Sequence, residues 1–295
     1  MTPDGLHVPL VTPFDAAGSV DPDALAGLAR DVLTAGAAGV VALGTTGEPS
    51  ALTRPERDTV LETVSRVCAE RSAGLLVGAN TEAELRDLAG RPAVTGALTL
   101  VPPFLRPGAA ATVAHLGRLA AISPVPMIVY HIPYRTGQPL PVTALRDLAG
   151  TPNIAGIKLA VGGIDADTVA LLADVPPDFA VLGGDDVFVS ALLALGGHGA
   201  ILASAHLATA GFAELVDAWR AGDARHGRAL GGPLAALSAA LFAEPNPAVV
   251  KAVLHAQGRI PTPAVRPPLL PAAPESLAAA LRCLAAATPA SAASG

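Results

Sequence analysis

Short, continuously apolar runs recur along this chain, and a longer segment rich in alanine and leucine follows each of them. Apolar and polar residues do not alternate within the runs, which is the pattern of parallel strands buried on both faces. The pattern predicts eight strands, at residues 7–12, 39–44, 74–79, 97–101, 126–130, 155–159, 180–184 and 200–203.

The segments between the predicted strands have the periodicity of amphipathic helices. Two examples are DPDALAGLARDVLTAG and TRPERDTVLETVSRVCAE, which open on the N-cap residues Asp21 and Thr53. Eight successive strand–helix units predict an α/β protein with the (β/α)8 fold, the TIM barrel. We therefore expect a barrel carrying the active site over residues 1–205, a C-terminal helical extension over 206–288 and a disordered tail at 289–295.

Composition and charge argue against several classes of protein. The 295 residues carry a formal net charge of −6 without a long basic run, which disfavours a nucleic-acid partner. Glycine, proline or charge interrupts every apolar run before the roughly 18 residues that a membrane span needs. The N-terminus lacks the basic and apolar regions of a signal peptide. We expect a cytoplasmic protein with no membrane contact and no metal site, since its cysteines and histidines lack metal-ligand spacing.

Polar residues stand where the strands of the predicted barrel end, which is where barrel enzymes carry their chemistry. GTTGE follows the second strand, YHIPYRT the fifth and GGDD the seventh. Lys158, one of only two lysines in the chain, falls within or at the end of the sixth strand. The pattern does not decide whether its side chain points into the barrel or out towards a helix.

A lysine in such an apolar run has a chemical explanation and a structural one. Burial favours the neutral amine, which can attack a ketone and form an imine that activates the neighbouring carbon. Alternatively, the stem packs against apolar side chains while the ammonium reaches a carboxylate. Lys251, on the helical segment PAVVKAVLHAQG, fits the structural explanation better.

The only two tyrosines of the chain, Tyr130 and Tyr134, both lie in YHIPYRT. Tyr130 at the tip of strand five could bring its hydroxyl beside an amine on strand six and move protons during imine formation; a core tyrosine bonded to backbone is the alternative. Arg135 could pair with a carboxylate or simply lie on the surface. The small residues of GTTGE could converge on an anion.

Together these segments resemble the dihydrodipicolinate synthase / N-acetylneuraminate lyase family of Schiff-base barrel enzymes. The matching stretches are VTPFDAAGSVD, AGAAGVVALGTTGE, YHIPYRTG, IAGIKLA, GGDDVFVSALLALGGHGAI and EPNPAVVKAVL. The resemblance implies that Lys158 forms the imine and that Tyr130 relays protons together with Thr45. It implies further that Thr45 and Thr46 bind the carboxylate of the 2-oxo acid, and that Arg135 holds the carboxylate of the incoming aldehyde.

By the same resemblance Gly184 and Ile201 line the pyruvate pocket. One departure concerns strand four, where synthases usually carry Pro-Tyr-Tyr and lend the second tyrosine to a neighbouring subunit. Here VPPFLRPG puts Pro103 and Phe104 at those places, so Phe104 in the substrate pocket offers no hydroxyl. The third helix is also expected to be truncated, because its segment is several residues short.

The favoured hypothesis is a class I lyase acting on pyruvate or another 2-oxo acid, whose enamine adds to an aldehyde or releases one. The best single activity is that of a 4-hydroxy-tetrahydrodipicolinate synthase. An aldolase or dehydratase of a 2-oxo-3-deoxy sugar acid is the alternative, and a non-catalytic barrel that binds a 2-oxo acid is an alternative of another class. The resemblance implies no cofactor, and it implies a homo-oligomer, a tetramer or a dimer.

Overall fold

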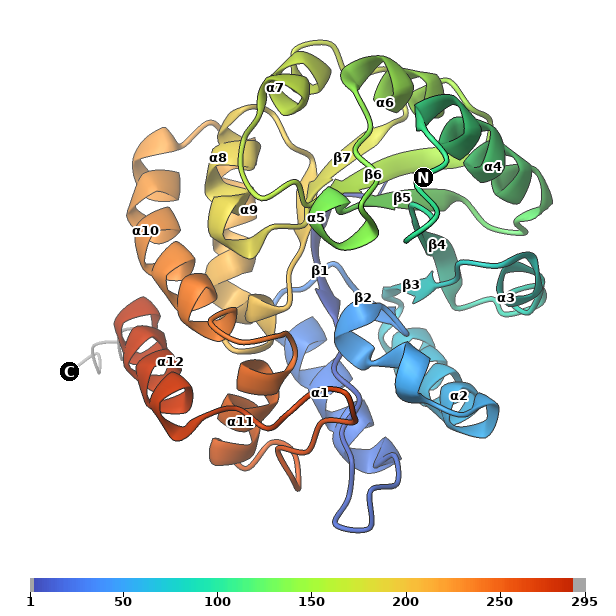
Figure 1. Ribbon diagram of the computed structural model, residues 1–295. Coiled ribbons are helices and arrows are strands. Elements are labelled where there is room, and N and C mark those ends of the chain that lie inside the picture. The colour runs from blue at the N-terminus through green and yellow to red at the C-terminus, as the bar shows by residue number, and fades with distance from the viewer. Residues whose placement is uncertain (1–2, 289–295) are drawn as a thin grey trace.

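The computed structural model describes residues 3–288, so the tail predicted at 289–295 lies outside the described residues. Within this range eight parallel strands close into a barrel in the order of the chain, and β8 pairs with β1 (Figure 1). The strands are β1 Gly5–Pro9, β2 Gly39–Ala42, β3 Gly74–Gly78, β4 Val94–Leu100, β5 Met127–His131, β6 Ile154–Leu159, β7 Ala180–Gly183 and β8 Gly199–Ile201. The predicted (β/α)8 fold is confirmed.

Six of the eight predicted strands run further at their C-terminal ends than the hydrogen-bonded strands do; β5 and β6 are the exceptions. The first was expected at 7–12 but β1 ends at Pro9, and the second was expected at 39–44 but β2 ends at Ala42. The residues that follow, such as Val11 and Leu43, remain buried although they have left the ladder. An apolar run indicates which residues are buried, whether or not they are hydrogen-bonded in the sheet. The run therefore continues beyond the last residue that pairs with a neighbouring strand.

Helices surround the barrel between the strands and extend beyond β8. They are α1 Pro22–Thr34, α2 Arg54–Arg71, α3 Glu82–Arg86, α4 Ala109–Ile122, α5 Pro133–Thr136, α6 Val142–Ala149, α7 Ala166–Leu172, α8 Val189–Ala194, α9 Thr209–Arg220, α10 Ala224–Leu241, α11 Ala248–Ala256 and α12 Pro274–Ala287. Helix α3, the helix expected to be truncated, has five residues.

The two predicted N-caps are where the sequence placed them. The Asp21 carboxylate accepts hydrogen bonds from the backbone N–H groups of Asp23 and Ala24 at the start of α1. Thr53 precedes α2 and donates both its backbone N–H and its hydroxyl to the Glu56 carboxylate. Each cap satisfies polar groups that a helix start would otherwise leave without partners.

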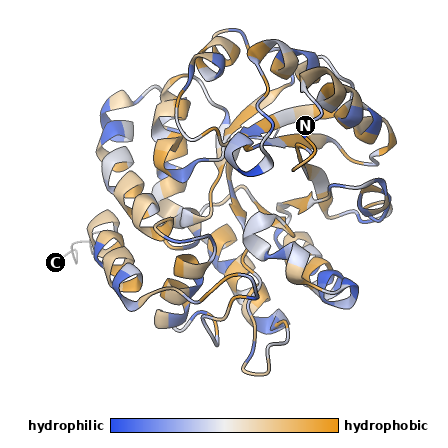
Figure 2. Ribbon diagram, in the orientation of Figure 1, coloured by the Kyte–Doolittle hydropathy of each residue, from blue (hydrophilic) through white to orange (hydrophobic). Residues whose placement is uncertain are grey.

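Two apolar layers hold the barrel together. The outer layer lies between the strands and the helices, and the inner one fills the barrel with Val, Leu, Ile and Ala side chains together with Tyr130. Figure 2 shows strands that are mainly hydrophobic and outer helices that mix hydrophobic with hydrophilic residues. None of the helices described is long and apolar enough to cross a membrane.

The C-terminal helices gather on one side of the barrel. Figure 1 shows α10 beside α8 and α9, and α11 and α12 lower on the same side. Helix α10 packs against α9 and α12, and α12 also packs against α11. The segments around α11 reach back to the loop that follows β2, and this contact shapes the site described next.

Candidate active site

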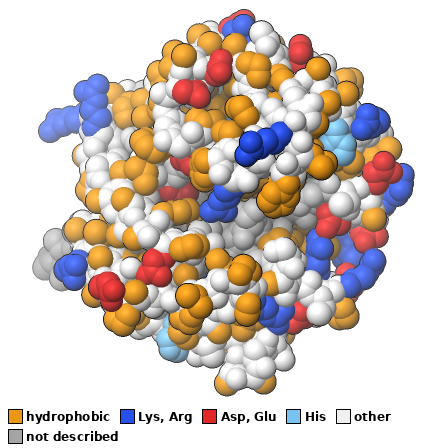
Figure 3. Space-filling model, viewed as in Figure 1, with side chains coloured by type: hydrophobic (Ala, Val, Ile, Leu, Met, Phe, Trp, Pro, Cys, Tyr) orange, Lys and Arg blue, Asp and Glu red, His pale blue; other side chains and the backbone are white. Residues whose placement is uncertain are grey.

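A small pocket of about 300 Å³ opens at the C-terminal ends of the strands. In Figure 1 the short helix α5 lies over the middle of this face, and Figure 3 shows acidic and basic side chains near its centre. Most of the site residues predicted from the sequence meet in the lining of this pocket: Thr45, Thr46, Tyr130, Arg135, Lys158 and Gly184.

Two predicted site residues lie elsewhere. Ile201, at the end of β8, is fully buried and packs in the inner layer of the barrel with Tyr130 and Leu182. Phe104, on the loop after β4, is 86% exposed and is not part of the pocket lining. Within a single chain, therefore, neither side chain adds to the wall of the pocket.

Lys158 points into the barrel, which settles the orientation that the sequence left open. Its partners across the sheet are Tyr130 on β5 and Leu182 on β7, and both belong to the inner apolar layer. Its chain neighbours Ile157 and Leu159 belong to the outer layer. The Lys158 Nζ atom lies 4.1 Å from the centroid of the Tyr130 ring.

Burial changes the acid–base behaviour of this lysine. Only 5% of Lys158 is exposed, and desolvation of the ammonium lowers its pKa from 10.5 to about 8. The Arg135 charge acts in the same direction, whereas Asp186 and Asp185 partly oppose the shift. At neutral pH roughly a tenth of the molecules therefore carry the neutral, nucleophilic amine.

Gly184 makes room for the lysine. A Cβ atom at this position would lie 2.7 Å from both Cγ and Cε of Lys158 and 2.9 Å from the backbone oxygen of Leu159. Real side chains do not tolerate such distances from backbone. The glycine therefore lets the lysine stem lie against the end of β7.

Tyr130 stays protonated while it faces the amine. Burial of the phenol raises its pKa above the ordinary value of 10, and nearby Asp185 and Asp186 add to the rise. Thr45, the first residue of the turn after β2, partly offsets this rise in the pKa and lines the same pocket. Two hydroxyl groups in one pocket next to an amine can pass a proton between them.

The threonine loop is held from the C-terminal part of the chain. Thr45–Gly47 forms a single 3₁₀ turn, and Thr46 is buried with its hydroxyl accepting a hydrogen bond from Asn246 Nδ2 at 2.9 Å. The Thr12 hydroxyl donates to the backbone oxygen of Gly47 at 2.7 Å. These contacts fix the turn and leave its hydroxyls at the edge of the pocket.

Glu48, the last residue of GTTGE, completes this anchor. Its carboxylate lies 2.9 Å from Lys251 Nζ and also accepts the backbone N–H of Arg266 at 2.7 Å. Lys251 is fully buried, and Phe14 lies under its ammonium with the ring centroid 4.1 Å away. The second lysine of the chain thus has the structural role expected for it.

The pocket also contains residues to which sequence reasoning gave no role. Tyr134 stands on α5 beside Arg135, Asp186 lies on the turn after β7, and Asn246 and Phe242 come from the connection between α10 and α11. Burial raises the pKa of the Asp186 carboxyl to about 6, and this carboxyl accepts the backbone N–H of Ser204. Asp186 lies in GGDD, noted in the sequence after the seventh strand, and Asn246 lies in EPNP, part of a stretch quoted for the resemblance.

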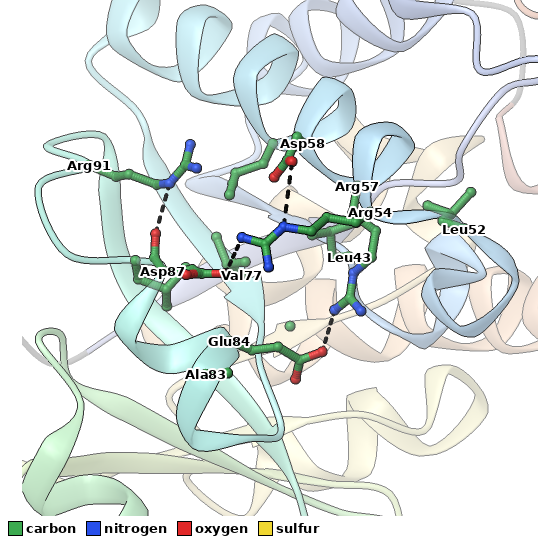
Figure 4. A pocket seen from close by; sticks show the side chains of 13 residues that line it. Leu43, Leu52, Arg54, Arg57, Asp58, Val77, Ala83, Glu84, Asp87 and Arg91 are labelled. Carbon is green, nitrogen blue, oxygen red and sulfur yellow. Dashed lines mark hydrogen bonds and ion pairs between the residues drawn. The ribbon is translucent and has the colours of Figure 1, made fainter.

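A larger cavity of about 720 Å³ lies between α2 and α3, outside this pocket (Figure 4). Its charged side chains pair with one another: Arg57 with Glu84, and Arg54 with Asp87 at 3.1 Å. Lys158 does not line it. Across residues 3–288 no group of three or more His, Cys, Asp or Glu side chains is arranged to hold a metal ion.

A TIM barrel with a buried, pKa-lowered lysine beside a tyrosine at the C-terminal ends of its strands defines a Schiff-base-forming lyase. Comparison with known proteins agrees with this class. The model of the dihydrodipicolinate synthetase family matches residues 2–287. The chain belongs to this family, and the resemblance noted in its sequence is confirmed.

Similar proteins match over most of the chain. The 4-hydroxy-tetrahydrodipicolinate synthase of Moorella thermoacetica is 37% identical over 280 residues, covering 92% of this chain and 95% of the relative. The synthase of Syntrophus aciditrophicus is 39% identical over 263 residues, covering 87% and 89%.

Solved structures show the same fold. The dihydrodipicolinate synthase of Aquifex aeolicus superposes with a TM-score of 0.87 at 30% identity, covering 95% of this chain and 97% of that one. The chloride-inhibited synthase of Acinetobacter baumannii, solved in complex with pyruvate, gives 0.90 at 31% identity and covers 96% and 98%. This chain is thus a class I lyase of a family whose members use pyruvate.

Proposed function

We propose that this chain acts as a 4-hydroxy-tetrahydrodipicolinate synthase and that Lys158 is its nucleophile. The observation that carries the proposal is the position of Lys158 Nζ, buried at the C-terminal end of the barrel over the Tyr130 ring. The relatives named above carry this activity in their names.

The first half of the reaction builds an imine. Thr45 and Thr46 hold the carboxylate of pyruvate at the turn after β2, which brings the ketone carbon to the Lys158 amine. The amine adds to the ketone, and Tyr130, coupled to Thr45, passes the protons that convert the hydroxyl of the carbinolamine into leaving water. The protonated imine then withdraws electrons from the methyl carbon of pyruvate, which loses a proton and becomes an enamine.

The second half joins the enamine to an aldehyde. The product named by the relatives is a seven-carbon ring dicarboxylate with a ring nitrogen, so a four-carbon amino acid aldehyde must add to the three carbons of pyruvate. Arg135, exposed on α5 at the pocket, holds the carboxylate of this aldehyde. The amino group of the aldehyde partner then attacks the imine, closes the ring and releases Lys158. The protonated imine is the only electron sink in this sequence, so the proposed steps use neither metal nor organic cofactor.

We also propose that the protein is a cytoplasmic homo-oligomer. Phe104 and Leu105, side by side on the loop after β4, are 86% and 80% exposed, which is unusual for large apolar side chains and typical of a contact surface. In such an assembly Phe104 would approach the substrate only from a neighbouring subunit.

The activity is tested by incubating the protein with pyruvate and the semialdehyde of aspartate, and by measuring pyruvate consumption and the mass of the product. The Arg135→Ala and Arg135→Lys variants are assayed in the same way. We expect Arg135→Ala to raise the KM for the aldehyde at least tenfold, Arg135→Lys to fall between, and pyruvate imine formation to persist in both. If the protein cleaves or dehydrates 2-oxo-3-deoxy sugar acids and does not catalyse the condensation, it is a sugar-acid aldolase or dehydratase and the proposed synthase activity is wrong. Imine formation without turnover of either class would favour a binding protein.

A further inference from the structure

Tyr134 is a second phenol at the pocket, and the imine chemistry leaves it without a task. It lines the pocket together with Lys158 and Arg135, although it stands at the mouth, where 59% of the side chain is exposed. Its hydroxyl donates to the Asp185 carboxylate at 3.1 Å. The other Asp185 oxygen accepts the backbone N–H of Gly162 at 2.6 Å.

Tyr134 is held at its backbone and at its hydroxyl. Helix α5 carries it on a single turn, Pro133–Thr136, which Gly137 caps with φ +75°. Asp185 accepts the hydrogen bond of the hydroxyl at 3.1 Å. A surface tyrosine with an anchored hydroxyl at the mouth of a pocket is poised to contact a substrate.

Addition of the enamine to an aldehyde needs an acid at a particular place. The carbonyl oxygen of the aldehyde becomes an alkoxide as the carbon–carbon bond forms, and this oxygen lies further from Lys158 than the ketone carbon of pyruvate does. Among the other hydroxyls that line the pocket, Tyr130 lies beside Lys158 and shares the imine steps with Thr45, and Thr46 accepts a hydrogen bond from the amide of Asn246. Phe104 carries no hydroxyl and does not line the pocket.

We propose that Tyr134 is the general acid that protonates the aldehyde oxygen during carbon–carbon bond formation, with Asp185 positioning it and returning its proton. The inference rests on the proposed function and deepens its second half.

The step balances as follows. The enamine carbon forms a bond to the aldehyde carbon, and the enamine nitrogen returns to the protonated imine. The π electrons of the C=O bond move to oxygen, which takes the phenolic proton of Tyr134. The proton that the methyl carbon released to solvent when the enamine formed is replaced by one taken from solvent, which passes through the half-buried Asp185 to the phenolate.

The local electrostatics agree with this role. Partial desolvation of the phenol, together with the neighbouring Asp185 charge, raises the pKa of Tyr134, so the phenol keeps its proton until a stronger base, the developing alkoxide, forms beside it. Burial likewise raises the pKa of the Asp185 carboxyl, which makes it able to accept and release a proton closer to neutrality than an ordinary aspartate.

Tyr134→Phe removes the hydroxyl and keeps the ring, and two separate assays divide the reaction. Exchange of the methyl hydrogens of pyruvate for deuterium in D₂O reports the imine and enamine without any aldehyde. Steady-state condensation with the semialdehyde of aspartate reports the second half. We expect Tyr134→Phe to keep exchange within about twofold of the wild type and to lower kcat for condensation about 100-fold.

Asp185→Asn serves as the matched variant for the positioning role, and its kcat for condensation should fall about tenfold with exchange retained. Unchanged condensation in Tyr134→Phe would overturn the proposal, and so would a rise in the KM for the aldehyde at unchanged kcat, which would make Tyr134 a binding contact. Absence of exchange in the wild type would instead overturn the proposed function itself, so the two failures are distinguishable.

Discussion

Lys158 and Tyr130 are direct partners on neighbouring strands, and the lysine nitrogen lies 4.1 Å from the centre of the tyrosine ring. A phenol face attracts an ammonium, which by itself would hold the proton on the lysine. Desolvation outweighs this attraction, since the pKa of Lys158 is lowered to about 8. The pair therefore combines an amine that is partly neutral with a hydroxyl that stays protonated.

Replacement of Tyr130 by phenylalanine tests the proton relay. The ring remains and fills its place in the inner layer of the barrel, while the hydroxyl that meets Thr45 is lost. We predict that imine formation with pyruvate slows by 100-fold or more, the usual contribution of general acid–base catalysis. Rapid-quench trapping measures the rate, and an unchanged urea unfolding curve excludes a packing defect. A rate within threefold of the wild type would contradict the role given to Tyr130.

The pH dependence of the first half-reaction follows from the lowered pKa of Lys158. Below pH 8 the protonated, inactive amine predominates, so kcat/KM for pyruvate rises about tenfold per pH unit and levels off above pH 8. An ordinary lysine would continue this rise to about pH 10.5. A profile with its midpoint near 10.5 would show that burial does not tune this amine.

Asp186 offers a test of the electrostatic part of that shift. Its charge favours the protonated form of Lys158 and so raises the lysine pKa. Asp186→Asn keeps an oxygen that can accept the backbone N–H of Ser204. We predict that the midpoint of the pH profile moves below that of the wild type. A midpoint that stays in place or rises would show that this charge does not act on the amine.

Gly184→Ala would push the lysine out of position. The new Cβ atom would lie 2.7 Å from two carbons of the Lys158 stem, and backbone beside it leaves no room for adjustment. We predict a loss of imine formation of at least 100-fold, because small displacements of reacting groups are costly. Gly163→Ala is the matched control, since nothing lies within 4 Å of the added atom there. Equal activity of the two variants would be evidence against this account of Gly184.

Lys251→Met tests the anchor of the threonine loop. The variant leaves the Glu48 carboxylate buried without its cation, which costs about 3–5 kcal/mol in similar cases. Urea unfolding should show this loss, and the double variant Lys251→Met with Glu48→Gln should recover part of it. The KM for pyruvate should also rise, since Glu48 follows the loop that bears Thr45 and Thr46. Full stability of Lys251→Met would show that the ion pair does not support the fold.

The barrel was predictable because its strands are buried on both faces, and so each leaves a continuous apolar run. The inward direction of the Lys158 side chain could not be predicted, because a strand buried on both faces has no polar face that would show which residues point inward. Thr45, Thr46 and Arg135 were placed at the site by their positions after strand ends, and the structure brings them to one pocket.

Contacts between distant segments left no local pattern. Asn246 reaches Thr46 across 200 residues, and Lys251 reaches Glu48 across 203, through the packing of the C-terminal helices. Tyr134 adjoins Arg135 in the sequence, yet its meeting with Asp185 depends on the turn of α5. Phe104 was expected in the pocket by resemblance alone, and it lies exposed on the loop after β4, with a φ of +71°.

The central claim is that Lys158 forms an imine with pyruvate. Incubation with pyruvate and sodium borohydride, followed by intact-protein mass measurement, reports this bond directly, with Lys158→Ala as the control. We predict one adduct of the mass of reduced pyruvate on the wild type, mapping by peptide digestion to Lys158, and none on the variant. An adduct that persists in Lys158→Ala, or no adduct on the wild type with pyruvate at millimolar concentration, would contradict the account.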